Sequence, residues 1–289
     1  MHRLEIALPE GYRSAGVFAF HSRDAEGVAE VVTPGRIRKA VMLDGVPVLL
    51  DVAIDTREAR CTIDSATMPA HAREALDSIL GLRIDPAPFM AAFGGDDLLG
   101  PVIQRQPGLR IVQSATVFEA LTWAIIGQQI NLPFAIALRR TFIQLGARRH
   151  ESGMWCYPDA ADVARLELDE LTTRKFSRAK AETLLRVARL VDDGELVLAH
   201  DDDPAHAAGQ LLAVKGIGPW TVNYTLLRGY GYPDCSLHGD VAIRAAFQRL
   251  LGEADKPSIA HTEALLEDYR PHRTMAAAYL WASLNQPAG

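Results

Sequence analysis

The chain has 289 residues, of which 48% are hydrophobic and 23% charged, an ordinary globular composition with enough apolar side chains for a sizeable core. The length allows one large domain or two to three small ones. The formal net charge of −6 weighs mildly against a nucleic-acid-binding protein, although backbone N–H groups can hold phosphate without basic side chains.

Cysteines and apolar runs restrict the class of protein further. The three cysteines, Cys61, Cys156 and Cys235, are odd in number and far apart, so no disulfide framework or zinc-site spacing is readable. Met1–Leu8 lacks the apolar stretch of a signal peptide, and no run approaches the ~20 apolar residues of a membrane span. We therefore expect a cytoplasmic chain without a membrane partner.

The first third of the chain has the pattern of an antiparallel sheet. Arg36–Leu43 and Val46–Ile54 are rich in β-forming residues, and Asp44-Gly45 between them is a strong hairpin signal. Arg60–Ile63 predicts a further strand. The segment Met68–Leu82 then has the apolar spacing of a helix.

The rest of the chain has the capping residues and the spacing of helices. Thr116 and Glu119 form a capping-box pattern, and Ser177 precedes a long amphipathic stretch. Asp203-Pro204 combines an N-cap with a proline at the first helical position. Three further helices are predicted at Trp220–Arg228, Val241–Leu250 and Met275–Leu284.

The two patterns together predict an α+β fold. An N-terminal antiparallel β domain is expected at residues 1–82, and an all-helical body with a central cleft at residues 83–289. The sequence contains no internal repeat and no low-complexity segment, so both parts are expected to be globular.

A glycine-containing turn between two predicted helices is the first functional motif. Gly216 and Gly218 flank Ile217, and both glycines are expected to permit positive φ and the close approach of another backbone. Pro219 presets the next helix, whose free N–H groups form an anion site for one phosphate. Such a turn binds nucleic acid without reading its sequence, although a simple connection between helices has the same pattern.

Asp240 follows the turn by about twenty residues, at a point where a loop becomes a helix. In isolation it would be an ordinary helix N-cap. The turn, the loop and Asp-Val-x-x-Arg at the helix start together resemble the signature of the helix-hairpin-helix DNA glycosylase superfamily. The combination is more specific than any of its parts.

Within that superfamily the chain resembles the AlkA-type 3-methyladenine DNA glycosylase II family. The matching blocks are Pro107–Arg110, Ile126–Ile130, Gly216–Tyr224, Leu226–Gly229 and Arg270–Arg273 with Trp281. The N-terminal part also resembles that family's extra domain, so the similarity covers nearly the whole chain. The resemblance implies hydrolysis of the N-glycosidic bond of alkylated bases, of the 3-methyladenine and 7-methylguanine type, in base excision repair.

Two branches of the superfamily do not fit this sequence. Branches that also cleave the strand place a Schiff-base lysine after the turn, and the matching position here is Trp220. The iron–sulfur branch needs four cysteines near its C-terminus, and this chain has none after Cys235. The resemblance therefore implies a monofunctional enzyme without a required cofactor.

The resemblance also assigns roles in a base pocket. Asp240 becomes the catalytic carboxylate, which stabilises positive charge on the sugar of a flipped-out nucleotide. Trp220, Tyr224 and Trp281 would hold a cationic base against their aromatic faces, and Gln128 would line the pocket. Core packing of the aromatic side chains and helix capping by the glutamine are the alternative interpretations.

Contacts to double-stranded DNA are expected along the turn and in the loop after Ile126. The residues implied are Lys215, Gly216, Ile217, Gly218, Thr221 and Gln129. Gln129 matches the position from which the family fills the gap left by the flipped base, and helix capping is its alternative. The carbonyls of Leu212, Val214 and Gly216 could hold a Na+ or K+ ion, and a monomer is expected.

Two other functions compete with this interpretation. A non-catalytic helix-hairpin-helix DNA-binding protein would need the turn, but neither Asp240 nor the aromatic residues. A glycosylase-lyase for oxidised bases would need an amine where Trp220 stands. The sequence has no phosphate-binding loop, no His-Glu-x-x-His and no nucleophile elbow, which leaves ATPase, metalloprotease and elbow-type hydrolase functions without support.

Overall fold

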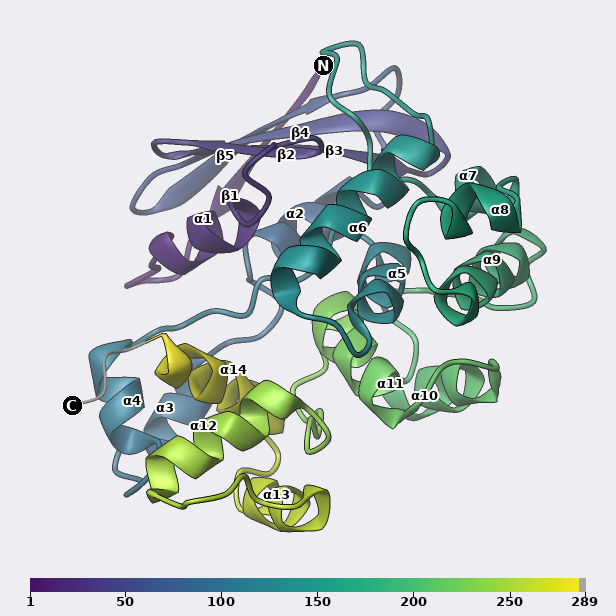
Figure 1. Ribbon diagram of the computed structural model, residues 1–289. Helices are drawn as coiled ribbons and strands as arrows, with labels where there is room; N and C mark the ends of the chain where they lie inside the picture. Colours follow the sequence, from purple (N-terminus) through teal and green to yellow (C-terminus); the bar gives the residue numbers. More distant parts are fainter. Residues whose placement is uncertain (286–289) are drawn as a thin grey trace.

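A computed structural model describes residues 1–285, which form an antiparallel sheet and two groups of helices (Figure 1). Within that range the sheet has five strands in the order β1-β5-β4-β3-β2, and neighbouring strands are antiparallel. The strands are β1 His2–Ala7, β2 Glu30–Thr33, β3 Arg36–Leu43, β4 Val46–Ile54 and β5 Glu58–Asp64. The predicted α+β class is confirmed.

The hairpin between β3 and β4 forms where the sequence predicts it, and both strands have the predicted bounds. Asp44 and Gly45 form the turn with φ of 51° and 76°. Two successive positive φ values are what a two-residue turn of type I′ requires, and they match the twist of the strands. Leu43 consequently pairs with Val46.

Neither edge strand, β1 nor β2, is among the predicted strands, and one helix is shorter than predicted. β1 and β2 have only six and four residues, too few for a clear alternation. The helix predicted at Met68–Leu82 spans only Ala72–Ile79 (α2). Pro69 accepts a hydrogen bond from Ala72 N in a preceding turn, and Gly81 ends the helix with a φ of 65°.

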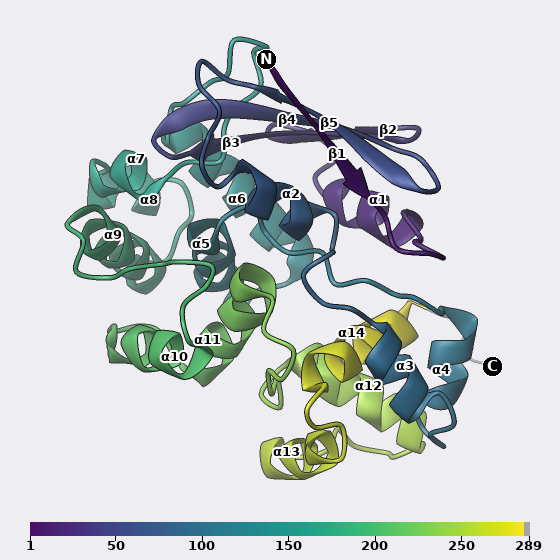
Figure 2. The same cartoon turned by 180° about the vertical axis from the view of Figure 1, so that it is seen from behind.

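The helices form two groups (Figures 1 and 2). The first group contains α5 Val117–Gly127, α6 Leu132–Leu145, α7 Ala160–Ala164, α8 Leu168–Thr172, α9 Arg178–Asp192, α10 Pro204–Ala213 and α11 Pro219–Thr225, which continues as the π-helical turn η1 Leu226–Tyr230. The second contains α3 Ala87–Phe93, α4 Gly100–Arg105, α12 Val241–Leu251, α13 Ile259–Glu267 and α14 Arg273–Leu284, with α4 and α12 packed on α14. The chain therefore enters the second group twice, once before α5 and once after η1.

Helix α1 (Ala15–His21), α2 and α6 cover one face of the sheet in both views (Figures 1 and 2). Apolar side chains of the strands, such as Leu50 and Ile63, pack there with Leu76 of α2 in the main core. Within residues 1–285, none of the helices has both the length and the apolar character needed to cross a membrane.

The predicted helix starts are confirmed at Ser177 and Asp203, whose side chains accept hydrogen bonds from the first-turn N–H groups. At Thr116 only half of the predicted capping box forms. The Thr116 hydroxyl accepts from Glu119 N at 3.0 Å, but the Glu119 carboxylate accepts from Ala115 N at 3.0 Å rather than from the N-cap. The predicted reciprocal hydrogen bond, from the N-cap N–H to the Glu119 carboxylate, is therefore wrong. The Glu119 side chain instead contacts residues that are far away in the sequence.

Glu119 belongs to a buried charge cluster, which we define as Glu30 of β2, Lys39 of β3, Glu119 of α5 and Arg139 of α6. Glu119 Oε1 accepts from Lys39 Nζ at 2.7 Å and from Arg139 at 2.9 Å, and Lys39 also donates to Glu30. Burial opposes the ionisation of Glu30, but the charges of Lys39 and Arg139 outweigh it and hold the pKa of Glu30 well below its ordinary value. The cluster joins the sheet to the first helical group.

Replacing Lys39 should show how strongly the cluster holds the sheet to the helices. Lys39→Met leaves two buried carboxylates with one guanidinium, and we expect it to lower the free energy of unfolding by about 3–5 kcal/mol. Arg38→Met is the matched control, because Arg38 is the neighbouring residue on β3 and its side chain is 40% exposed. Urea denaturation should give at most about 1 kcal/mol for the control. Equal losses in the two variants would contradict the assigned role of the cluster.

Candidate functional site

The turn between α10 and α11 has the geometry of a close backbone approach. Gly216 has a φ of 99°, and a Cβ added to it would lie 2.1 Å from Thr183 Oγ1 of α9. Only glycine combines this φ with this contact. Ile217, one of the implied DNA contacts, is buried, and its N–H donates to Val214 O at 3.1 Å, which closes the turn.

Gly218 differs from the sequence-based expectation. Its φ is −110° and its ψ is 176°, an extended conformation open to any residue, and a Cβ built there meets nothing within 4 Å. The prediction that both glycines need positive φ is therefore wrong for Gly218. Its missing side chain instead leaves open space in front of the start of α11.

Gln128 connects the end of α5 to the turn. It occupies the C-cap position of α5, and its Nε2 donates to Gly216 O at 3.2 Å and to Thr221 Oγ1 at 2.9 Å. Thr221 is only 2% exposed, so this structure does not place it at the surface, where the predicted DNA contact would need it. Gln129 is exposed and has a φ of 55°, which directs the chain sharply away from α5 towards α6.

Asp240 lies at the N-cap of α12 with its carboxylate surrounded by donors. Oδ1 accepts from Ala242 N at 2.9 Å and from Ile243 N at 3.0 Å, which is the N-cap pattern. The indole N–H of Trp220 donates to Oδ2 at 2.9 Å, and that of Trp281 donates to Oδ1 at 3.3 Å. Asp240 is half-buried, so the helix cap leaves part of the residue exposed.

Three aromatic side chains from two different helical groups meet beside this carboxylate. The ring centroids of Trp220 and Tyr224 are 5.1 Å apart, and those of Tyr224 and Trp281 are 6.3 Å apart. All three side chains are half-buried, unlike the fully buried core aromatics such as Tyr279. We call this set the aromatic group. Its partial exposure leaves aromatic surface beside Asp240.

The site also contains residues that sequence reasoning did not assign to it. Trp123 of α5 donates from Nε1 to the Tyr224 hydroxyl at 3.0 Å. The Arg228 guanidinium lies 5.4 Å from the Trp281 ring centroid and 4.9 Å from that of Phe20 in α1. No local signal marks Phe20 or Trp123, because each reaches the site only through the packing of distant segments.

The remaining predicted residues lie on or near the turn. Lys215 is exposed, and its carbonyl accepts a hydrogen bond from Arg186 at 2.9 Å. The carbonyls of Val214 and Gly216 each accept a hydrogen bond, from Ile217 N and from Gln128, so each keeps one lone pair.

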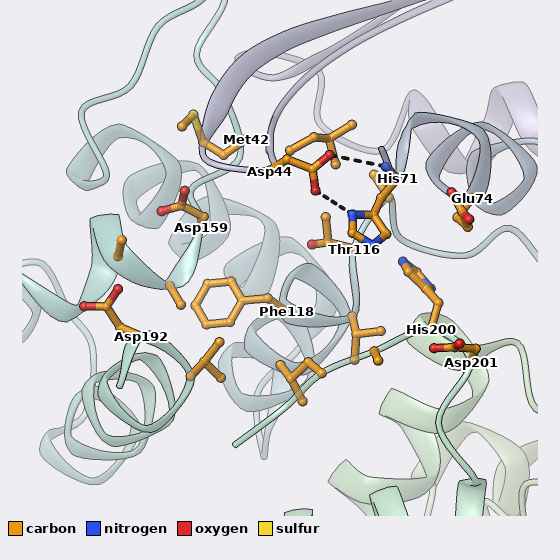
Figure 3. A pocket seen from close by; sticks show the side chains of 18 of the residues that line it. Met42, Asp44, His71, Glu74, Thr116, Phe118, Asp159, Asp192, His200 and Asp201 are labelled. Atoms are coloured by element: carbon orange, nitrogen blue, oxygen red, sulfur yellow. Dashed lines mark hydrogen bonds and ion pairs between the residues drawn. The ribbon is translucent and has the colours of Figure 1, made fainter. Parts of the chain in front are cut away.

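A cavity of about 630 Å³ lies elsewhere, at the opposite end of α5 (Figure 3). Thr116 and Phe118 form part of its wall, and none of the predicted site residues lines it. Its carboxylates are those of Asp44, Glu74, Asp159, Asp192 and Asp201, which disfavour a phosphate backbone. Since α5 has 11 residues, roughly 16 Å separate this acidic cavity from Gln128.

The two glycines of the turn should respond differently to a methyl group. Gly216→Ala combines a positive φ with the clash against Thr183, and we expect it to lower the free energy of unfolding by about 2 kcal/mol or more. Gly218→Ala has an allowed φ and free space, so its change should stay within about 1 kcal/mol. Chemical denaturation of both variants measures this, and a larger loss for Gly218→Ala would refute the geometry.

The chain is similar to known DNA repair proteins. Residues 122–272 match the HhH-GPD superfamily base excision DNA repair protein family. A putative DNA-3-methyladenine glycosylase of Bacillus subtilis, YfjP, is 30% identical over 191 residues, 64% of this chain and 65% of that protein, just under two thirds of its length. The DNA-3-methyladenine glycosylase of the same organism is 27% identical over 291 residues, 96% of each chain.

A solved structure supports the same grouping at the level of the fold. The 3-methyladenine DNA-glycosylase from Archaeoglobus fulgidus superimposes with a TM-score of 0.83 and 23% identity, covering 96% of this chain and 97% of that one. The family match includes more than half of the chain, the turn with Gly216 and the carboxylate of Asp240. The chain therefore belongs to the HhH-GPD superfamily of base excision DNA repair proteins.

Proposed function

We propose that the protein is a monofunctional DNA glycosylase that flips alkylated bases out of double-stranded DNA and hydrolyses their N-glycosidic bond. One observation carries the proposal. The Asp240 carboxylate is held by four hydrogen bonds beside the half-buried aromatic group, where a base and its sugar can be placed together. The names of the two Bacillus subtilis relatives support alkylated purines such as 3-methyladenine as substrates.

The chemistry needs a fixed negative charge near the sugar. As the N-glycosidic bond breaks, positive charge develops on the deoxyribose, as it does in glycoside hydrolysis. Asp240 stabilises that charge and orients the attacking water, since its donors fix the carboxylate before the reaction begins. A purine methylated at N3 or N7 is already cationic and leaves easily, so little acid catalysis on the base is required.

The aromatic group supplies the binding surface for the flipped base. Trp220, Tyr224 and Trp281 contribute faces that attract an electron-poor ring, worth on the order of 1–2 kcal/mol when desolvated. Flipping exposes the base to this group and leaves a gap in the duplex. Gln129, exposed at the α5–α6 connection, is the residue proposed to fill that gap.

The turn is proposed to hold one phosphate near the flipped nucleotide. The first N–H groups of α11 have no partner within the helix, and Gly218 leaves the approach to them open. Lys215, exposed beside the turn, adds positive charge. Gln128 bonds the turn to the end of α5, so the proposed phosphate contact lies beside the proposed gap-filling loop.

A monovalent cation belongs to the same proposal. The carbonyls of Leu212, Val214 and Gly216 would hold it, using the lone pairs that Val214 and Gly216 retain. Its charge would strengthen the attraction of the turn for phosphate. The proposal includes a monomer that acts on DNA in the cytoplasm.

The carboxylate can be tested without loss of the helix cap. Asparagine caps helices as well as aspartate does, so Asp240→Asn should fold normally while losing the negative charge. We expect base release from methylated duplex DNA to fall at least about a hundredfold, with DNA binding retained. Asp255→Asn, at an exposed aspartate, is the control and should match the wild type. A wild-type chain that binds DNA but releases no base would favour the non-catalytic alternative.

The reaction type can be tested by trapping with borohydride. A lyase needs an amine that attacks the sugar, and Trp220 stands where that amine is expected. Lys39 is held by two carboxylates, and Lys180 is buried, donates to Ile126 O at 2.8 Å and has its pKa lowered by burial. We expect no covalent adduct and strand breaks only after alkali. An adduct that disappears in Lys180→Met or Lys215→Ala would overturn the monofunctional assignment.

A further inference from the structure

The two oxygens of the Asp240 carboxylate have unequal sets of partners. Oδ1 accepts three hydrogen bonds, from Ala242 N at 2.9 Å, from Ile243 N at 3.0 Å and from the Trp281 indole at 3.3 Å. Oδ2 accepts one, from the Trp220 indole at 2.9 Å, and no other donor in the described part of the chain reaches it. A carboxylate oxygen has two lone pairs. Oδ1 is therefore saturated, whereas Oδ2 keeps one lone pair for a reacting partner.

The two indoles that donate to this carboxylate come from different helical groups. Trp220 is the second residue of α11, directly after the glycine turn, so it belongs to the first group (Figure 1). Asp240 caps α12, and Trp281 lies on α14, which packs on α12 in the second group. The Trp220 hydrogen bond therefore fixes Oδ2 relative to the turn. The Trp281 hydrogen bond only adds a contact within the second group.

Trp220 also belongs to the aromatic group. Its ring lies against that of Tyr224, with the centroids 5.1 Å apart, and the side chain is half-buried. Its hydrogen bond of 2.9 Å to Oδ2 has the ordinary length for an N–H donor and an oxygen acceptor, whereas the 3.3 Å bond of Trp281 is long. The same rigid side chain therefore has an aromatic face beside the carboxylate and an N–H that holds one oxygen of it.

We propose that Trp220 is a positioning residue whose indole N–H holds Oδ2 of Asp240 in place, and that Oδ2 is the oxygen that faces the sugar. This inference rests on the proposed glycosylase function and deepens it. A base stacked on the Trp220 face is at a fixed distance from Oδ2, because one rigid indole contacts both. A phosphate bound at the turn holds the same side chain through the backbone of α11.

The position of Oδ2 matters because the positive charge on the sugar exists only while the bond breaks. A carboxylate stabilises that charge best when it is already in place and does not have to reorient. The helix cap fixes Oδ1, but the carboxylate can still tilt about Oδ1 unless Oδ2 is also held. Loss of the Trp220 N–H should therefore slow the chemical step, whereas loss of aromatic surface should weaken binding of the base.

The test compares Trp220→Phe with Trp281→Phe, which each remove one indole N–H from the same carboxylate and keep an aromatic face. Single-turnover release of 3-methyladenine from duplex DNA is measured against enzyme concentration, which gives a maximal rate and a half-saturating concentration. We expect Trp220→Phe to lower the maximal rate about tenfold or more, the scale of a hydrogen bond to a charged group. Trp281→Phe should lower it at most about threefold, because Oδ1 keeps two backbone donors. The half-saturating concentration should rise similarly in both.

Two further variants separate positioning from a general loss of structure. Trp155→Phe is the control, because Trp155 contacts Arg149 outside the site, and its maximal rate should equal that of the wild type. Trp220→Phe added to Asp240→Asn should cause no further loss of the residual release, since no carboxylate remains to be positioned. A further tenfold loss in that background would assign the effect to the ring itself and overturn the inference.

A solution measurement tests the hydrogen bond without activity, and it applies even if Trp220→Phe does not fold. The chain has four tryptophans, so 15N-labelled protein gives four indole N–H signals. Asp240→Asn should move the proton signal of Trp220 upfield, because an amide is a weaker acceptor than a carboxylate. The signal of Trp155 should stay in place. An unmoved Trp220 signal would show that the hydrogen bond does not form in solution and would overturn the inference.

The outcomes also separate this inference from the proposed function. A wild-type chain that releases no 3-methyladenine would overturn the glycosylase function itself. A wild-type chain that releases it, with equal losses of maximal rate in Trp220→Phe and Trp281→Phe, would overturn the positioning role alone.

Discussion

Helix α5 is the element on which both ends of the site depend, and a buried charge fixes it. Every residue from Val117 to Ile126 is buried, so this helix cannot shift without repacking the core. Near its start Glu119 accepts a hydrogen bond from Lys39 of the sheet, and at its end Gln128 donates one to the carbonyl of Gly216. Separating the buried Glu119 carboxylate from Lys39 would be costly, so this ion pair holds α5 in place. Helix α5 then positions the glycine turn through Gln128.

Asp240 caps α12 and carries the proposed catalytic charge, two roles that sequence reasoning treats as alternatives. The backbone N–H groups of Ala242 and Ile243 donate to Oδ1 as a helix cap, and the indoles of Trp220 and Trp281 donate to the same carboxylate. The cap immobilises the charged group, which is what preorganised electrostatic stabilisation requires. The start of α12 also favours a negative charge, through the helix dipole. Structure and chemistry therefore draw on the same hydrogen bonds.

Much of this protein follows from the sequence alone because the signals are local. Asp44-Gly45 specifies the hairpin through two positive φ values, and Ser177 and Asp203 specify helix starts through their own side chains. The glycine turn and Asp-Val-x-x-Arg also lie close together in the chain, and the superfamily whose signature they resemble is confirmed by the family match. Each of these features depends on residues close together in the chain.

Tertiary structure decided what depends on residues far apart. The sequence predicts that the Glu119 side chain bonds to its own helix cap. In the structure it accepts a hydrogen bond from Lys39, 80 positions away, as part of the charge cluster. Gly216 and Gly218 look alike in the sequence, but Gly218 has an extended backbone. Only Gly216 lies against α9, where an added Cβ would meet Thr183. Trp123 and Phe20 reach the site through packing between separate segments, which leaves no periodicity or motif to detect. Local propensity fixes the elements, but the contacts between them determine which side chains share the pocket.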